Sequence, residues 1–448
     1  MNESIVIHTI SSAGSALSKT DIKSLGIDRL SLVLGAEKIY VDKILSAIER
    51  HLDDEGFMKA ASGYEWYSAE WFRDSSMVSI SLTQFASFLR KNGFNDTNQI
   101  WRVRDASNRL LSFMLATVGS FQSNIEGGLL ADLNDEKAHL LHNHIPARFG
   151  KDKTYFKLNT ANMQYSDEVD GQNSWLRQHD SIPLLLIAVE YFVNEFGLDA
   201  LHGRDTLKRL LPVLTAYLSK VYVIPCSNAW ELENTRFHSY SLASIYRGLA
   251  AAENLLKPLG VNDEKGVYAG ACRNNMEKIK NILDSVFVKD KTLYRSVDGP
   301  LDRPNLILEG DAAEIFIFTL FDTPFDEEVK HNTLNLMEKE LFGQNVLPIR
   351  FKNDVYFDGG RWLLLGLEFA YYYMSVGEHV KASRIMKYVQ KKYLDLDDQL
   401  PEQEIVDPAS PGRDPDKMLE KNGGNTIKDL AWSEAEYLRA ATRYLLRT

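Results

Sequence analysis

The apolar positions of this chain recur at helical spacing almost throughout, and strand-like alternation is rare. Apolar residues three and four positions apart mark one face of a helix. By this criterion the chain contains about twelve helices and has an all-α fold. The expected ranges are 38–52, 74–92, 98–119, 180–196, 204–221, 237–256, 263–286, 311–320, 326–342, 361–376, 379–394 and 429–446.

Two kinds of helix alternate along the sequence. The odd-numbered ones have a single apolar stripe, as Leu207, Leu211 and Leu218 form in 204–221, whereas the even-numbered ones are apolar nearly all round, as in IPLLLIAV at 182–189. A helix of the first kind has one face in water, and a helix of the second kind must be covered on every side. The alternation predicts an (α/α)6 barrel with the even helices inside. An irregular all-α domain or a helical solenoid is the alternative, but no repeated unit supports a solenoid.

Composition narrows the class of protein. The 448 residues are 44% apolar and 25% charged, as expected for a soluble globular chain, and the net charge is −11. With no basic tract, binding to nucleic acid or to an anionic membrane surface is not expected. No run approaches the roughly 18 apolar residues of a membrane span. A neutral substrate fits this charge balance better.

The linkers, the N-terminal segment and the cysteines bear on domain organisation and cellular location. No linker rich in proline or glycine divides the chain, so a single barrel over 1–448 is expected, with a long loop insertion around 121–178. The N-terminus does not read as a signal peptide, and the two cysteines, Cys226 and Cys272, are far apart in sequence. We therefore expect a cytoplasmic protein without a disulfide or a cysteine zinc site.

Candidate chemistry lies in the segments just before the even helices, where Trp, Arg, Asp and Glu cluster beside glycine. If these helices form the inner ring, the segments meet at one end of the barrel. Aromatic rings stack on the apolar face of a pyranose, and its hydroxyls suit charged, bidentate partners. Glycosidic cleavage requires two carboxyl groups. Glu231 and Glu402 lie in well-separated loops and could face each other across this end.

These motifs together resemble glycoside hydrolase family 15, the glucoamylase family, whose fold is an (α/α)6 barrel. They are WFRDS at 71–75, Trp175 with RQHD at 177–180, WE at 230–231, YFDGGRW at 356–362, LPEQ at 400–403 and LAWS at 430–433. They occur in the family's order, so the resemblance covers nearly the whole chain.

The resemblance implies an inverting, exo-acting α-glucoside hydrolase that releases β-glucose from short α-gluco-oligosaccharides and uses no cofactor and no catalytic metal. Glu231 resembles the general acid and Glu402 the general base, with Glu404 as a rival base. As the acid, Glu231 needs a pKa raised by burial or by a negative neighbour such as Glu233 or Glu402. The residues that resemble substrate-binding positions are Tyr67, Trp71, Arg73, Asp74, Trp175, Asp180, Trp230, Arg350, Trp362 and Trp432.

Several alternatives stay open at this point. Leu232 stands where fungal members of the family have an acid that helps bind the leaving sugar, so α-1,4, α-1,6 and α,α-1,1 linkages are all candidates. A glucan-binding regulatory module without turnover is the alternative from another class. His139, His142 and His144 are interpreted as a polar loop rather than a metal site. The oligomeric state is not predicted.

Overall fold

The computed structural model describes residues 34–62, 67–94, 97–123, 125–126, 148–153, 168–169, 172–173, 178–233, 235–263, 266–354, 356, 359–404 and 427–446. All twelve predicted helices are present within these residues. They are α4 (Lys38–His51), α5 (Phe72–Lys91), α6 (Asn98–Ser120), α9 (Ser181–Phe196), α10 (Arg204–Val221), α11 (Ser239–Leu256), α12 (Val267–Ile282), α13 (Ile315–Thr319), α14 (Glu327–Met337), α15 (Leu363–Val376), α16 (His379–Val389) and α18 (Ala431–Leu445). Short π-helical turns extend α12, α14 and α16, and the 3-10 turn η7 (Ala312–Glu314) precedes α13.

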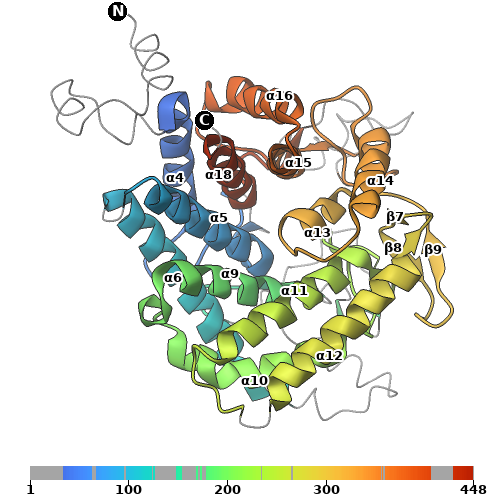
Figure 1. The fold of residues 1–448 in the computed structure, drawn as a ribbon. Coiled ribbons are helices and arrows are strands. Elements are labelled where there is room, and N and C mark those ends of the chain that lie inside the picture. The colour runs from blue at the N-terminus through green and yellow to red at the C-terminus, as the bar shows by residue number, and fades with distance from the viewer. Residues whose placement is uncertain are drawn as a thin grey trace, which may run out of the picture.

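The helices form two concentric rings, as predicted (Figure 1). In the inner ring α5 packs against α9, then come α11, α13, α15 and α18, and α18 closes the ring against α5. The outer helices cover the inner ones: α4 lies on α18, α6 on α5, α12 on α11 and α16 on α15. The fold is an (α/α)6 barrel, so the fold class predicted from the alternation of helix types is confirmed.

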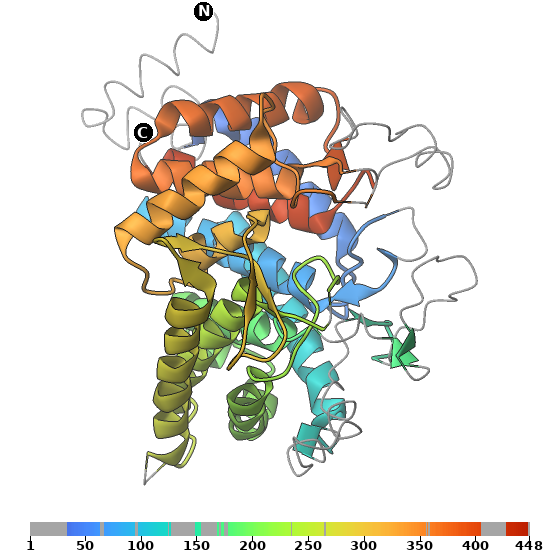
Figure 2. The same cartoon turned by 90° about the vertical axis from the view of Figure 1, so that its right-hand side faces the viewer.

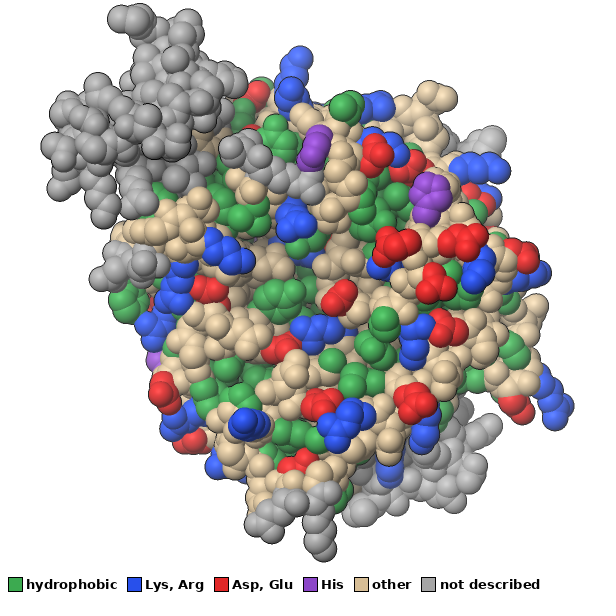
Figure 3. Space-filling view, in the orientation of Figure 1, with side chains coloured by type: hydrophobic (Ala, Val, Ile, Leu, Met, Phe, Trp, Pro, Cys, Tyr) green, Lys and Arg blue, Asp and Glu red, His purple; other side chains and the backbone are tan. Residues whose placement is uncertain are grey.

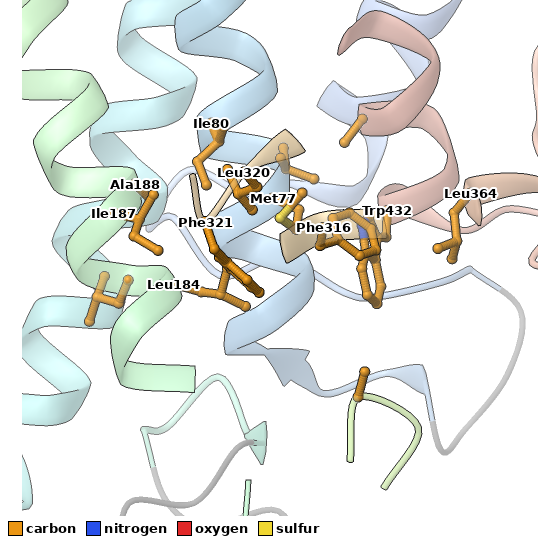
Figure 4. Close-up of a cluster of buried hydrophobic side chains, with 14 of the residues drawn as sticks. Met77, Ile80, Leu184, Ile187, Ala188, Phe316, Leu320, Phe321, Leu364 and Trp432 are labelled. Carbon is orange, nitrogen blue, oxygen red and sulfur yellow. The ribbon is translucent and has the colours of Figure 1, made fainter. Parts of the chain in front are cut away.

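Burial follows the apolar pattern of each helix. In the inner helix α9, every residue from Ser181 to Glu190 is buried, whereas the outer helix α16 buries only Ala382, Ile385, Met386 and Val389. The inner helices supply the barrel core, where Met77 of α5, Leu184 of α9, Phe316 of α13 and Trp432 of α18 approach one another (Figure 4). Burial of such side chains stabilises the fold by roughly 1.5–3 kcal/mol each.

Short antiparallel strands join the loops beside the barrel. β1 (Glu70–Trp71) pairs with β2 (Arg148–Phe149), β10 (Arg361–Trp362) with β11 (Gln403–Glu404), β3 (Glu168–Val169) with β4 (Gln172–Asn173), and β6 (Val288–Lys289) with β7 (Thr292–Leu293); β8 (Ser296–Asp298) lies between β5 (Phe237–His238) and β9 (Asn305–Ile307). In Figure 2, β1 and the start of α5 lie on the right-hand side of the barrel.

The predicted helix starts at 74, 237, 263, 311, 361 and 429 differ from the observed ones by two to four residues, and those at 237 and 361 share one cause. The helices begin at Ser239 and Leu363, because the two residues before each of them pair in a strand with a distant loop. Helical periodicity does not report such pairing.

The surface agrees with the charge balance of the sequence. On the face shown in Figure 3, acidic and basic side chains are interspersed and form no extended basic stripe. Among the described helices, none combines the length and the hydropathy that a bilayer crossing requires.

Candidate functional site

The residues that precede the inner helices meet at one end of the barrel, as predicted. Arg73, in the first turn of α5, binds Asp180 at the start of α9 through Nε and Nη2, at 2.7 and 3.3 Å. The same guanidinium donates to the backbone oxygen of Ala229, in the loop before α11. The Trp230 indole then donates to Asp311, the N-cap of η7, at 2.8 Å. These contacts join the starts of four inner helices.

Glu402 lies in this cluster, just before β11. The carboxylate is buried, and its Oε1 accepts a hydrogen bond of 2.8 Å from the hydroxyl of Tyr67. The hydroxyl of Tyr356 lies 2.9 Å from that of Tyr67. The backbone oxygen of Glu402 accepts from the N–H of Leu363, and its N–H donates to the oxygen of Ile427. Both the side chain and the backbone are therefore fixed before any substrate arrives.

Tyr67 and Trp71 link the two predicted catalytic carboxylates. Their rings stack with centroids 5.3 Å apart and an interplanar angle of 28°. The Tyr67 hydroxyl donates to Glu402, while the Trp71 indole donates to Oε1 of Glu231 at 2.9 Å. One pair of stacked rings therefore carries a donor to each carboxylate.

Glu231 occupies a tight turn in the loop before α11. The side-chain oxygen of Asn228 accepts from the backbone N–H groups of Trp230 and Leu232, at 2.9 and 3.0 Å, so that the turn wraps around it. Glu231 adopts a φ of 64°, a left-handed conformation that costs a residue with a Cβ about 1–3 kcal/mol. Such strain clusters at functional sites. Asn228 is a positioning residue that the sequence motifs did not single out.

The prediction that a negatively charged residue lies beside Glu231 was wrong. Its carboxylate forms an ion pair with Arg148 of β2, and Glu233 instead binds Arg236 and Arg295, at 2.6 and 3.2 Å. The Arg148 guanidinium also lies over the Trp71 ring, 4.5 Å from its centroid. A neighbouring cation favours the ionised carboxylate, which is the opposite of what a proton donor needs.

Two other acids at this end of the barrel hold their protons more tightly than usual. Burial raises the pKa of Glu402 to about 7, although the hydrogen bond from Tyr67 and the charge of Arg350 oppose the shift. Burial also raises the pKa of Asp74 to about 7, opposed by the charge of Arg73 and reinforced by that of Glu402. The effect of Glu402 on the pKa of Asp74 places the two carboxyl groups in the same electrostatic environment.

Arg350 lies in a cage of aromatic rings. Asp354 holds its guanidinium with two hydrogen bonds of 2.7 and 2.6 Å, and both side chains are buried. The rings of Trp362, Tyr356 and Trp230 lie 4.7, 4.9 and 5.4 Å from the guanidinium carbon. A desolvated, bidentate arginine is rigid, which suits it to orienting a hydroxyl-rich ligand.

The tryptophans that resemble substrate-binding positions differ in their surroundings. Trp230 and Trp362 pack against each other, with centroids 5.3 Å apart, and are only 7% and 4% exposed. Trp432 donates its indole N–H to Glu436 at 3.0 Å, and its ring lies 5.9 Å from the Arg73 guanidinium. Trp175 lies outside the described residues, as do His139, His142 and His144 and most of the insertion at 121–178.

Glu404, the rival base, is engaged elsewhere. Its carboxylate accepts from Tyr388 at 2.8 Å and from Tyr393, and it pairs with Lys392 at 3.1 Å, all on α16 and the turn that extends it. The side chain therefore belongs to the packing between the two rings. Asp311, Arg148 and Tyr356 also contribute to the site but were not among the predicted site residues, although Tyr356 lies in the YFDGGRW motif.

Comparisons with known proteins support the fold. No protein-family model matches the chain. It is 23% identical to the isomaltose glucohydrolase of Kribbella flavida over 405 residues, which cover 88% of this chain and 89% of that protein. A glycosidase variant solved in complex with glucose superposes with a TM-score of 0.72 at 19% identity, covering 94% of this chain and 99% of the other.

A glucoamylase from Saccharomycopsis fibuligera superposes with a TM-score of 0.61 at 14% identity, covering 93% of this chain and 97% of the other. At such identities the superpositions establish the fold. The chain has the (α/α)6 fold of glucoamylase-type glycosidases, and it resembles glycoside hydrolase family 15 in both its motifs and its structure.

Proposed function

We propose that the protein is an inverting, exo-acting α-glucoside hydrolase in which Glu231 protonates the leaving oxygen and Glu402 activates the attacking water. The observation that carries the proposal is the stacked pair of Tyr67 and Trp71, which holds one carboxylate at each end. Two carboxyl groups held on opposite sides of a sugar are what inverting hydrolysis requires. Both are retained, which argues against a regulatory module without turnover.

Glu402 has the surroundings of a general base. Burial strengthens its affinity for a proton, and the Tyr67 hydroxyl aims its carboxylate without adding a charge. A base acts only when ionised, so activity is expected to rise as the pH increases through about 7, the value to which burial raises the pKa of Glu402. Asp74 and the Arg73–Asp180 pair are proposed to bind the glucose unit at the non-reducing end.

Glu231 must hold a proton to act as the acid, and its ion pair with Arg148 opposes this. We propose that the arriving oligosaccharide separates the two side chains. A sugar between them desolvates the carboxyl group, and desolvation favours its neutral form. On this proposal, the ion pair between Glu231 and Arg148 forms only when no substrate is bound.

The relative of known activity guides the choice of linkage. The named substrate of the Kribbella flavida protein is isomaltose, so the α-1,6 linkage is the first to test. The absence of an acid at Leu232 agrees with a leaving-group side unlike that of fungal glucoamylases. We also propose a cytoplasmic location, which the two buried free cysteines support.

Proton NMR of the anomeric signals during digestion tests the proposal. Isomaltose, maltose, trehalose and maltotetraose are offered separately, and the first glucose signal is followed before mutarotation. Initial β-glucose is expected, from isomaltose above all. Initial α-glucose from isomaltose or maltose means retention and overturns the mechanism, while binding of a glucan without any glucose released favours the regulatory module.

A further inference from the structure

A second cluster of ionisable side chains lies between the outer helix α4 and the inner helix α18. His51 is the last residue of α4, Asp429 precedes α18 by two positions, and Glu434 lies in its first turn. Their side chains are only 1%, 4% and 0% exposed. Nε2 of His51 and one oxygen from each carboxylate all lie within 4.8 Å of one another.

The two contacts of His51 in this cluster are longer than charge-assisted hydrogen bonds. Nε2 of His51 is 3.5 Å from Oδ1 of Asp429 and 3.5 Å from Oε2 of Glu434. A charged imidazole that donates to a carboxylate lies about 2.7–2.9 Å from it. Within the described part of the chain, no contact of full hydrogen-bond geometry reaches Nε2 of His51, Oδ1 of Asp429 or either side-chain oxygen of Glu434, although the two carboxylates raise the pKa of His51 to about 9 against the effect of burial. Buried polar atoms are seldom left in this state.

The same spacing matches donors around a metal ion. Bonds from zinc to nitrogen or oxygen are about 2.0–2.2 Å long, so donors on a tetrahedral ion lie about 3.3–3.6 Å apart. We propose that His51, Asp429 and Glu434 bind a divalent transition-metal ion, for which Zn²⁺ is the best match. One imidazole and two carboxylates balance its charge, and an imidazole donor is not a ligand that Ca²⁺ or Mg²⁺ favours.

The neighbouring contacts are those of a built site. Ser62 donates to Oδ2 of Asp429 and so turns the other oxygen of that carboxylate toward His51. Outer partners of this kind commonly orient metal ligands.

The site joins three stretches of chain. The backbone N–H of Lys59 donates to the oxygen of His51, and that of Ala431 donates to the oxygen of Ala60. A metal here fixes the start of α18, which carries Trp432, against α4. Its role is structural and is independent of the proposed hydrolysis.

Metal content and thermal stability test the proposal together. Protein made without a histidine tag, in medium containing zinc, is analysed for metals, and its Tm is measured before and after chelation and after addition of ZnCl2, MgCl2 or CaCl2. About one zinc per chain is expected, with a fall in Tm of at least about 3 °C on chelation that ZnCl2 alone reverses.

Two variants and a control locate the ion. Asp429→Asn and Glu434→Gln should lose the zinc and the response to chelator. Glu190→Gln, which alters a buried acid that pairs with Arg247, should keep both. Zinc retained in both cluster variants overturns the assignment. The assignment is also overturned if the wild-type protein contains no metal and its Tm changes with neither chelator nor ZnCl2. This second outcome can be measured even if the variants do not fold.

Discussion

The two halves of the candidate site are held in different ways. Glu402 is buried, its partner Tyr67 is uncharged, and its backbone is tied to α15 and to Ile427. Glu231 is about one-fifth exposed, has a strained backbone, and is paired with a charged residue from β2, outside both rings of helices. The first half is rigid and set by the barrel, and the second depends on a loop insertion.

This difference separates what the fold fixes from what can vary. The water-activating half is built from strands and loops that the inner helices hold in place, so it suits a step common to every linkage. The leaving-group half carries the contact with Arg148 and the change at Leu232. Linkage preference is therefore expected to depend on residues around Glu231 and not on those around Glu402.

Loss of either carboxylate should have the largest effect. Glu402→Gln and Glu231→Gln are each expected to lower kcat for a disaccharide by roughly 10²–10⁴-fold, because each removes a general acid–base group. Steady-state kinetics measures the fall in kcat, and ligand binding by both variants should stay unchanged. Glu404→Gln is the matched control and should stay within about 10-fold of wild type. A fully active Glu402→Gln variant would refute the base assignment.

The rigid half is tested next by Tyr67→Phe. The variant keeps the stacked ring and removes the hydroxyl that stabilises ionised Glu402, so the pKa of Glu402 rises further above about 7. The acid limb of the kcat/KM profile should move to higher pH, with roughly a 10-fold loss at pH 7. Tyr388→Phe, which alters a donor to Glu404, should leave the limb in place. An unmoved limb in Tyr67→Phe argues against Glu402 as the titrating base.

The variable half responds more weakly, through Arg148→Met. Removing the cation beside Glu231 makes the carboxyl group easier to protonate, so the activity of the variant relative to wild type should increase with pH, by about several-fold. Arg148→Lys keeps the charge and should behave more like wild type. If both variants give the same pH profile as wild type, the ion pair does not influence the protonation of Glu231.

A similarly small effect is expected for Trp71→Phe. The ring that stacks on Tyr67 remains, and only the N–H donor to Glu231 is lost. A decrease of about two- to ten-fold in kcat is expected from one hydrogen bond. Trp101→Phe, on an exposed ring of α6, controls for the substitution. A loss as large as that of Glu231→Gln would mean that Trp71 does more than orient the carboxylate.

The sequence predicts the fold almost completely. In two rings of helices, the outer helices bury one face and the inner helices are buried on every side. Helical periodicity and the alternation of one-sided and all-round apolar helices report this difference in burial. The starts at 237 and 361 were missed because Phe237 and Trp362 pair with residues far away in the chain. Local patterns carry no information about such partners.

The sequence predicts which loops meet before the inner helices but not the electrostatics between them, and the catalytic and binding roles of the site residues stay predictions. Arg73 and Asp180 are in contact, as their positions before the inner helices imply, and Tyr67 binds Glu402. The pairing of Glu231 with Arg148 and the hydrogen bond of Trp230 to Asp311 could not be foreseen, because each joins segments with no fixed spacing. For the same reason, no motif contains His51, Asp429 and Glu434 together.

The most direct test of the two carboxylate roles compares leaving groups. Fluoride leaves with little help from an acid, whereas a sugar needs its oxygen protonated. On α-glucosyl fluoride, Glu231→Gln should recover most of the rate that it loses on isomaltose, and Glu402→Gln should stay slow on both. Recovery by Glu402→Gln together with a slow Glu231→Gln would contradict the account and exchange the two roles.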